Sequence, residues 1–246
     1  MDSAIVLQAR MGSTRLPGKS LAPVAGRSLL AHCVERLRAS SDMRVVVATT
    51  MRMEDDSVER EAERLGVEVV RGPDEDVLAR YVMVAMRLGL VDLVRATADN
   101  PAVDIDAPRR VLDIRRRTGA DHVVEFGLPY GSAVEAVSTA ALVRAAALAT
   151  DAADREHVTS FIRRDSRFVA ISAIAPPAVR RPNLRLTVDT AEDLEWVRRI
   201  FGLAERRGGD RECAPTPIPL STLIAVAEPL IRVDTTGNGS GARDTG

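Results

Sequence analysis

The chain has 246 residues, with 34 lysines and arginines against 35 aspartates and glutamates, so its formal net charge is −1 at pH 7. This near balance argues against the broad basic surface of a nucleic-acid-binding protein, and no apolar run approaches the roughly 20 residues that a membrane-spanning helix needs. Hydrophobic residues make up 46% and aromatic residues only 3%, which predicts a core built from aliphatic side chains.

The first half of the chain alternates apolar runs with segments of helical periodicity. Runs typical of buried strands occupy residues 4–7, 44–49, 67–70 and 92–97. Helices are predicted over residues 27–40 and 55–65, with Gly66 just past the second of them. Asp74 is expected to cap a third helix, whose inward residues are Val77, Leu78, Tyr81, Val82 and Met86. Strands that alternate with helices predict a mainly parallel sheet covered on both faces.

The second half is less regular. Its predicted helices span 107–118, 138–150, 155–164 and 220–230, and its predicted strands span 121–125, 133–137, 168–174 and 183–187. Thr190 can be the N-cap of a further helix, with Asp193 three positions on. A linker is expected at 208–219. We expect a single domain over residues 1–233, with an inserted segment at about 121–170, and a disordered tail at 234–246 that is rich in Gly, Thr, Ser and Asn.

Neither of the two cysteines has the spacing of a metal ligand. Cys33 falls on the apolar face of a predicted helix and is expected to be a small buried residue. No CxxC or HExxH motif indicates a zinc site. The N-terminus enters the first strand without a basic and apolar leader, which favours a cytoplasmic protein.

The loop after the first predicted strand carries the strongest signal for a ligand. It spans residues 8–19 and contains two glycines, two small hydroxyl residues and the cations Arg10, Arg15 and Lys19. Small residues let backbone N–H groups converge on an anion that the cations neutralise, so we expect a polyphosphate here. Lys19 is the only lysine in the chain, which favours a site shaped for a compact ammonium group. The alternative is a simple turn that has kept a lysine by accident.

Two other predicted strands end in polar residues. Thr49 ends the second strand, and Thr97, Asp99 and Asn100 follow the fourth. Ligands of open α/β sheets bind beyond the carboxyl ends of the strands, so these residues should share one rim with the loop. No GxGxxG motif follows the first strand, which argues against a dinucleotide-dependent oxidoreductase.

Asp99 and Asp189 each come directly after a predicted strand. A carboxylate that faces phosphates needs a cation between them, and Mg²⁺ is normally held by one or two carboxylates plus phosphate oxygens. On the residues alone, Asp99 could be a turn residue. Asp189 could be an acid at the start of a helix, where the helix dipole favours it.

Three motifs resemble those of the cytidylyltransferase family, which includes SpsF-type spore-coat polysaccharide proteins and the enzymes that activate acylneuraminate and Kdo sugars with CTP. Q-A-R-M-G-S-T-R-L-P-G-K-S-L looks like the nucleotide-binding loop of that family. R-A-T-A-D-N-P looks like its motif that ends in Gly-Asp-x-Pro, and L-T-V-D-T-A-E-D-L like its second metal-aspartate motif. The resemblance implies an α/β fold, a three-layer α/β/α Rossmann-like sheet of the nucleotide-diphospho-sugar transferase type.

The same resemblance implies roles for individual residues. Asp99 and Asp189 match the metal aspartates, and the catalytic set is Arg10, Arg15, Lys19 and Asp99. One departure is Ala98, where the family usually has glycine. The nucleotide-binding residues that it implies are Gln8, Ala9, Arg10, Met11, Gly12, Ser13, Arg15, Lys19, Thr49, Thr97 and Asp99.

The middle of the chain also resembles this family, so that the likeness covers roughly residues 4–202. Y-G-S-A-V-E-A-V-S is similar to its G-L-D-V-E segment, and D-R-E-H-V-T-S-F-I to its E-R-E-H-V-T-P-Y-I segment. Ala133 stands where that pattern has aspartate, which leaves the acceptor open. Asn100, Glu135, Glu156 and His157 are the candidate acceptor-site residues. Glu156 and His157 could instead be a polar pair on a helix face.

These motifs together predict a Mg²⁺-dependent nucleotidyltransferase. The family implies transfer of CMP from CTP to a sugar, sugar acid or related phosphonate or phosphate, with release of pyrophosphate. It also implies a role in polysaccharide biosynthesis and a homodimer. The charge balance and the lack of a long apolar run favour neither nucleic acid nor membrane as a partner.

Two rival functions stay open at this point. A glycosyltransferase that uses a nucleotide-sugar would hold its metal with a D-x-D motif, and two occur, at residues 74–76 and 104–106. Both look like acids at the start of helices, and neither explains the loop at residues 8–19. A non-catalytic nucleotide-binding domain would keep this loop but would not need both Asp99 and Asp189.

Overall fold

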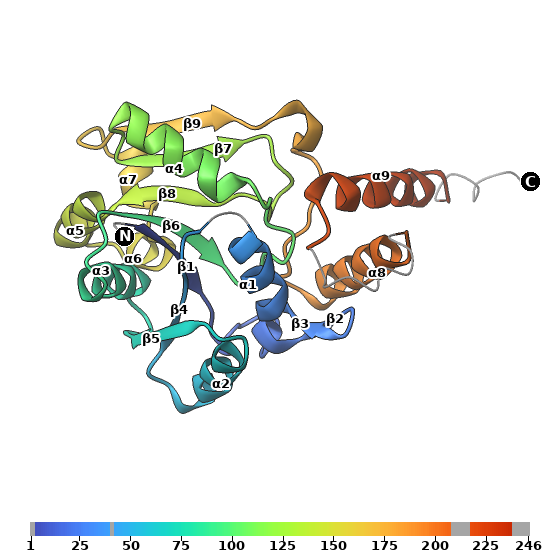
Figure 1. Cartoon of the computed structure of the whole chain (residues 1–246), viewed down its shortest axis with the longest axis horizontal. Coiled ribbons are helices and arrows are strands. Elements are labelled where there is room, and N and C mark those ends of the chain that lie inside the picture. The colour runs from blue at the N-terminus through green and yellow to red at the C-terminus, as the bar shows by residue number, and fades with distance from the viewer. Residues whose placement is uncertain (1–2, 40–41, 208–216, 238–246) are drawn as a thin grey trace, which may run out of the picture.

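The computed structural model describes residues 3–39, 42–207 and 217–237, and its centre is a seven-stranded sheet (Figure 1). The strands lie in the order β5-β4-β1-β6-β8-β7-β9. Their bounds are β1 (Ser3–Gln8), β4 (Val45–Thr50), β5 (Glu68–Gly72), β6 (Asp92–Thr97), β7 (His122–Phe126), β8 (Glu135–Ser138) and β9 (Ala170–Ile174). Strand β8 is antiparallel to both of its neighbours, and the other pairs in this sheet are parallel. The prediction of a mainly parallel sheet is confirmed.

Helices cover both faces of this sheet, as predicted. They are α1 (Leu29–Ala39), α2 (Asp56–Arg64), α3 (Val77–Arg87), α4 (Ala107–Thr118), α5 (Thr139–Leu148), α6 (Ala152–His157), α7 (Ser160–Arg164), α8 (Ala191–Arg207) and α9 (Leu220–Gly237). One core cluster packs α1, α2 and α4 against the sheet, and another packs α3, α5 and α7. A third cluster joins α8 and α9, which lie side by side at the right in Figure 1, to the short hairpin β2 (Pro23–Val24) and β3 (Arg27–Ser28).

Strand β1 shows how the sequence builds these layers. Its side chains alternate, with Ile5 and Leu7 in the core on one face and Ala4 and Val6 in the core on the other, all of them fully buried. Full burial of each large aliphatic side chain stabilises the fold by roughly 1.5–3 kcal/mol. Because β1 pairs in parallel with β4 and β6, their carboxyl ends lie at one edge of the sheet.

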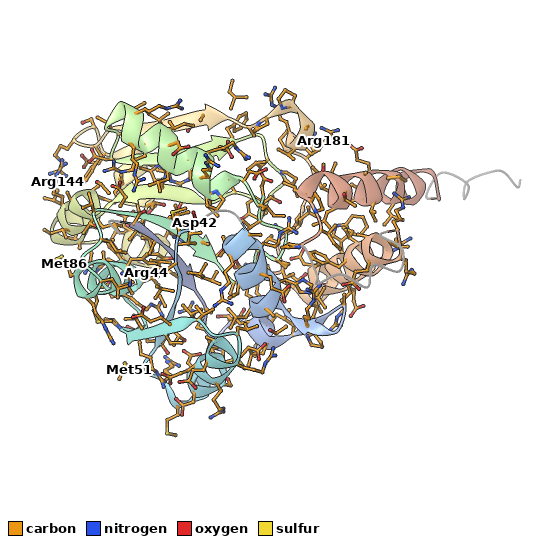
Figure 2. The ribbon with its side chains drawn as sticks, viewed as in Figure 1. Asp42, Arg44, Met51, Met86, Arg144 and Arg181 are labelled. Carbon is orange, nitrogen blue, oxygen red and sulfur yellow. The ribbon has the colours of Figure 1, made fainter. Side chains whose placement is uncertain are left out.

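Helix α3 differs from the prediction at both ends. Asp76, not Asp74, is its N-cap, because the Asp76 side chain accepts a 2.8 Å hydrogen bond from the backbone N–H of Ala79. Met86 was expected to face inward but is 65% exposed, on the outer side of the helix (Figure 2). It follows Val77 by about two and a half helical turns, which places it on the opposite face.

The helix predicted over 155–164 is broken at Val158, which separates α6 from α7. Val158 has φ 61° and ψ −59°, and the N–H of Thr159 donates to the carbonyl of His157 at 2.6 Å. This is the strained form of the three-residue γ-turn, and such a backbone costs roughly 1–3 kcal/mol. Val158 is completely buried, so packing of its side chain holds the turn in place.

The strand predicted over 183–187 is also wrong. Within the described residues this segment makes a single isolated bridge, between Arg185 and Tyr130. Gly131 has φ 93°, and a Cβ built there would lie 2.6 Å from the backbone nitrogen of Thr187. The two segments of the chain therefore run so close together that only a glycine fits at position 131, and the pairing ends there.

Two predictions concern segments that are only partly described. Helix α9 continues to Gly237, inside the predicted tail, and residues 238–246 lie outside the described residues. Most of the predicted linker, residues 208–216, lies outside them as well, so the organisation as one domain with a disordered tail stays a prediction.

Of the helices described, none is long and apolar enough to cross a membrane. Cys33 is fully buried, as expected.

Candidate functional site

A cleft of about 820 Å³ opens where β1 and β6 end. It is bounded by the loop after β1, the loop after β6, the connection between β7 and β8, and the first turns of α3. The structure gathers most of the predicted site residues around it, namely Gln8, Ala9, Arg10, Ser13, Arg15, Lys19, Thr97, Asp99, Asn100, Glu135, Glu156, His157 and Asp189. The three sequence segments that carry the predicted phosphate and metal residues therefore meet in one place.

Thr49, Met11 and Gly12 do not line this cleft. Thr49 was expected at a strand end, but β4 continues to Thr50, which pairs with Gly72 of β5, so Thr49 is buried inside the sheet. The structure therefore does not place Thr49 where a nucleotide could contact it.

Hydrogen bonds to its backbone hold the loop after β1 in position. The side chain of Asp55 accepts from the N–H of Met11 at 2.6 Å and from the hydroxyl of Thr50. Gly18, in the left-handed conformation with φ 75°, donates to the carbonyl of Met11 at 2.9 Å. This turn starts the short helix η1 (Lys19–Leu21) and fixes the direction in which Lys19 leaves the loop.

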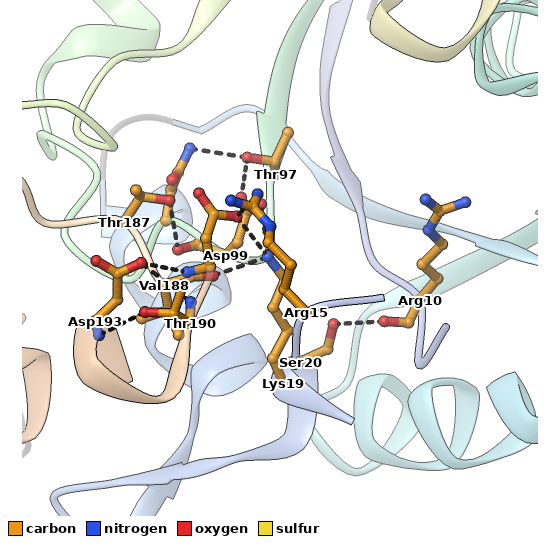
Figure 3. A network of polar contacts seen from close by, with 12 residues as sticks. Arg10, Arg15, Lys19, Ser20, Thr97, Asp99, Thr187, Val188, Thr190 and Asp193 are labelled. Carbon is orange, nitrogen blue, oxygen red and sulfur yellow. Dashed lines mark hydrogen bonds and ion pairs between the residues drawn. The ribbon is translucent and has the colours of Figure 1, made fainter. Parts of the chain in front are cut away.

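Lys19 joins three segments of the chain that are far apart in sequence (Figure 3). Its Nζ lies 3.0 Å from Oδ1 of Asp189, 3.2 Å from Oδ2 of Asp99 and 2.8 Å from the carbonyl oxygen of Val188. An ammonium group has three donors, and all three are engaged. Arg15 adds a second cation, with Nη2 3.2 Å from Oδ1 of Asp189.

The two aspartates are themselves held in position. Asp99 accepts a 2.5 Å hydrogen bond from the hydroxyl of Thr97, which in turn accepts one from the side-chain amide of Asn100 at 2.8 Å. The backbone of Asp99 accepts from the N–H of Val188 at 2.8 Å. The loop after β6 is thus tied directly to the segment that carries Asp189.

The other oxygen of Asp189 contacts Arg185, whose Nη2 lies 2.9 Å away. Burial alone would raise the pKa of Asp189, but the hydrogen bonds and charges of Lys19, Arg185 and Arg15 hold it below its usual value. Asp189 is therefore ionised near neutral pH.

Asp193 anchors the start of α8 beside this cluster. Its carboxylate accepts from the backbone N–H groups of Asp189 at 2.9 Å and of Thr190 at 3.1 Å, and its own N–H donates to the Thr190 hydroxyl at 3.2 Å. The predicted capping arrangement between Thr190 and Asp193 is confirmed. Hydrogen bonds from Arg185 are the largest cause that lowers the pKa of Asp193, to about 2.

The depressed pKa of Asp193 predicts a loss of stability in acid. Its folded pKa is below the unfolded value of about 3.9, so its contribution is complete above that pH and is lost as the pH falls toward about 2. We expect wild type to lose about 2 kcal/mol more unfolding free energy than Asp193→Asn between pH 5 and pH 2, since one pKa unit corresponds to about 1.4 kcal/mol. Urea denaturation of both proteins across this pH range measures the difference. Unfolding free energies that fall in parallel with pH in the two proteins would contradict the prediction.

Arg10 lies apart from the Lys19 cluster (Figure 3). Its carbonyl accepts from the hydroxyl of Ser20 at 2.9 Å, but its guanidinium approaches Asp74 and Glu156 only to 3.9 and 3.6 Å. The cations of the loop therefore form two groups, with Arg15 and Lys19 on the aspartates and Arg10 toward α3 and α6.

Glu135 is the centre of a buried polar cluster that also borders the cleft. Its carboxylate lies 2.7 Å from Nη1 of Arg95 and 3.3 Å from Nε2 of His122, and it accepts from the hydroxyl of Thr159 at 3.0 Å. Burial alone would raise the pKa of Glu135, but the charge of Arg95, with smaller contributions from His122 and Arg163, holds this pKa well below the usual range. Glu156 and His157 are exposed and lie just before the strained turn at Val158.

Arg95 lines the cleft but was not recognised as a site residue from the sequence. The signal that could have found it is an arginine in the middle of the apolar strand β6, where an ionisable side chain needs a buried partner.

Neither D-x-D motif reaches this cleft. Asp76 caps α3 and contacts Arg155 at 2.5 Å, and Asp104 forms an ion pair with Arg110, which also contacts Glu125 at 2.7 Å. Both aspartates thus have structural partners. Among the described residues there is also no group of three or more His, Cys, Asp or Glu side chains that could hold a metal without a ligand's help.

Two solved structures have a fold similar to that of this chain. A cytidylyltransferase from Leptospira borgpetersenii serovar Hardjo-bovis superposes with a TM-score of 0.81 and 25% identity, and all of both chains is covered. The structure of a CMP:2-keto-3-deoxy-manno-octonic acid synthetase complexed with CTP superposes with a TM-score of 0.65 and 18% identity, over 82% of this chain and 99% of that one. At that identity the second likeness shows the fold alone.

The sequence comparisons are more specific. The spore coat polysaccharide biosynthesis protein SpsF of Bacillus subtilis (strain 168) is 34% identical over 213 residues, which are 84% of this chain and 89% of SpsF. The profile of the family described as Cytidylyltransferase matches residues 4–209, which include the loop after β1 and both aspartates. On the strength of these two matches, this chain belongs to the cytidylyltransferase family.

Proposed function

We propose that the protein transfers CMP from CTP to a sugar, a sugar acid or a related phosphonate or phosphate acceptor, and that pyrophosphate is the second product. The observation that carries the proposal is the position of Lys19, which joins the loop after β1 to Asp99 and Asp189 inside the cleft. Family membership supports the reaction class, and the absence of both D-x-D motifs from the cleft lining disfavours a glycosyltransferase.

The residues of the cleft suggest how the reaction is assisted. An acceptor oxygen attacks the α-phosphorus of CTP, and the bond between this phosphorus and the bridging oxygen to the β-phosphorus breaks. We propose that Lys19, Arg15 and Arg10 bind the phosphates and that most of the rate enhancement comes from positioning and charge stabilisation. Asn100, Glu135, Glu156 and His157 also line the cleft, and we propose that they contact the acceptor.

The donor set around Lys19 also fits a divalent metal ion. Two carboxylates and one carbonyl already approach a single positive charge within 3.2 Å, and hard oxygen ligands are those that Mg²⁺ prefers. We propose that Asp99 and Asp189 hold Mg²⁺ together with the nucleotide, after Lys19 has turned toward the phosphates. When bound, Mg²⁺ would offset the negative charge that develops on the α-phosphate.

A pyrophosphate-release assay tests this function. CTP and the other nucleoside triphosphates are each incubated with Mg²⁺ and a panel of sugars, sugar acids, sugar phosphates and phosphonates. We expect pyrophosphate from CTP with at least one acceptor class. Consumption of a nucleotide-sugar without pyrophosphate would favour the glycosyltransferase, and nucleotide binding without any turnover would favour the non-catalytic domain.

We further propose a homodimer to which the segment at about 121–170 contributes. Strand β9 follows this segment at an open edge of the sheet, and beside it the side chains of Phe126 and Ile174 are 66% and 70% exposed. Large apolar side chains next to an unpaired edge strand favour association. Sedimentation should show a dimer at micromolar concentration, which Phe126→Asp with Ile174→Asp should convert to a monomer. A monomeric wild type would contradict the proposal.

A further inference from the structure

Arg80 is a buried cation that has no partner among the described residues. It lies on α3 and is 2% exposed, and its Nε and Nη1 are fully covered without a hydrogen bond. Arg36 on α1 is also 2% exposed but donates to the carbonyl oxygens of Val103 and Ile218, both at 2.6 Å. The Nη2 of Arg36 is also buried without a hydrogen bond, but its Nε and Nη1 both have oxygen partners, whereas neither Nε nor Nη1 of Arg80 has one.

Such an arrangement destabilises the free protein, because a buried charge has lost its water and no carboxylate of the described residues forms an ion pair with it in exchange. Burial lowers the pKa of Arg80, and the nearby charge of Arg10 lowers it further, while Tyr81, Asp74 and Asp55 act in the opposite direction. None of these three makes a hydrogen bond or an ion pair with Arg80. Buried charges in proteins normally have a paired partner, so an unpaired one beside a cleft points to a ligand that supplies the partner.

Arg80 is one of the residues that line the cleft, with Val77 from the same helix, and the charge of Arg10 is near enough to lower its pKa. Its stem packs over Gly72, where an added Cβ would lie 3.2 Å from Cγ of Arg80. Three other cations of the cleft already contact carboxylates, since Lys19 and Arg15 contact Asp189 and Arg95 contacts Glu135. Arg80 is thus the buried cation of this cleft that still lacks an oxygen partner in the described part of the chain.

We propose that Arg80, together with Arg10, forms a subsite for a phosphate group of the bound nucleotide. The proposal rests on the function proposed above. A guanidinium presents a planar fork of donors that matches two phosphate oxygens, and the negative charge of a phosphate compensates the buried positive charge. A nucleotide base offers only neutral acceptors, which would leave that charge uncompensated. The ligand of Arg80 is therefore the phosphate tail.

The test is Arg80→Met, which keeps the apolar stem and removes the charge. Two opposite effects are expected together. The unliganded variant should melt at a higher temperature than wild type, and its affinity for inorganic tripolyphosphate, measured by calorimetry, should fall about 10- to 150-fold, the range typical of a lost charge-assisted hydrogen bond. Arg87→Met, an exposed position on the same helix, should change neither quantity. Arg80→Lys should keep part of the affinity.

The outcomes separate this proposal from its alternatives. Unchanged tripolyphosphate affinity in Arg80→Met would overturn it, and so would weaker binding of cytidine with unchanged binding of tripolyphosphate, because Arg80 would then contact the base. A lower melting temperature in both Arg80 variants would make Arg80 a structural residue and would also overturn it. If wild type binds tripolyphosphate through Arg80 but no combination of a nucleotide and an acceptor yields pyrophosphate, the subsite stands and the proposed function fails.

Discussion

Asp99→Asn and Asp189→Asn are each expected to lower the rate of pyrophosphate release by about 10²–10³, the usual effect of removing one charged stabiliser of a transition state. Each substitution replaces a charged oxygen ligand with a neutral one, so the proposed metal ion is bound more weakly. Raising Mg²⁺ should recover part of the activity of each single variant. The double variant should be inactive at any Mg²⁺ concentration. The two losses should be non-additive, because both residues act on one ion.

The aspartate variants should affect stability much less than activity. Both side chains lie at the edge of the cleft, and a substitution away from the core usually changes the unfolding free energy by no more than about 1 kcal/mol. Asp193→Asn is the matched control, since Asp193 contacts Arg185 like Asp189 but does not line the cleft. It should lower stability more than turnover. If Asp189→Asn instead melts several degrees lower with unchanged turnover, Asp189 only anchors the start of α8.

The order of strands and helices was predictable because it depends on local patterns. The aliphatic runs of β1, β4 and β6 are buried on both faces of a parallel sheet, so the runs themselves mark the strands. The break at Val158 was not predictable, because a valine in that conformation contradicts local preference and is held by tertiary packing. Asn183 to Thr187 reads as a strand, but among the residues that the structure describes it bridges only to Tyr130.

The site was predictable as a set of residues but not as a set of contacts. The polar residues after β1 and β6 can be recognised in the sequence because they directly follow apolar strands. The direction of a side chain and the choice of its partner depend on residues that are distant in sequence, such as the 170 positions between Lys19 and Asp189. For the same reason the sequence could not reveal that Glu135 pairs with Arg95, or that Nε and Nη1 of Arg80 have no hydrogen-bond partner in the described part of the chain.

Lys19→Ala is expected to weaken nucleotide binding and turnover, because the loop loses its ammonium group at the phosphates. Loss of one charge-assisted hydrogen bond costs about 1.5–3 kcal/mol, or about 10- to 150-fold. Lys19→Arg should restore little, since the planar guanidinium is too long for a position where three oxygens lie within 3.2 Å of Nζ. Steady-state kinetics of pyrophosphate release measure both variants. Wild-type kinetics in Lys19→Arg would contradict a specific need for lysine.

Lys19→Ala should have the opposite effect on the binding of a metal ion in the absence of nucleotide, which it should strengthen. In the free protein the ammonium group of Lys19 lies between the carboxylates of Asp99 and Asp189, so it competes with a metal ion for the same oxygens. Lys19→Ala should therefore bind Mn²⁺, a paramagnetic substitute for Mg²⁺, more tightly than wild type when titrated by electron paramagnetic resonance. Arg15→Ala, which removes a more exposed cation from Asp189, should change Mn²⁺ affinity less. Asp99→Asn in the Lys19→Ala background should abolish the gain. Equal Mn²⁺ affinity in wild type and Lys19→Ala would show that the lysine and the metal do not share these carboxylates.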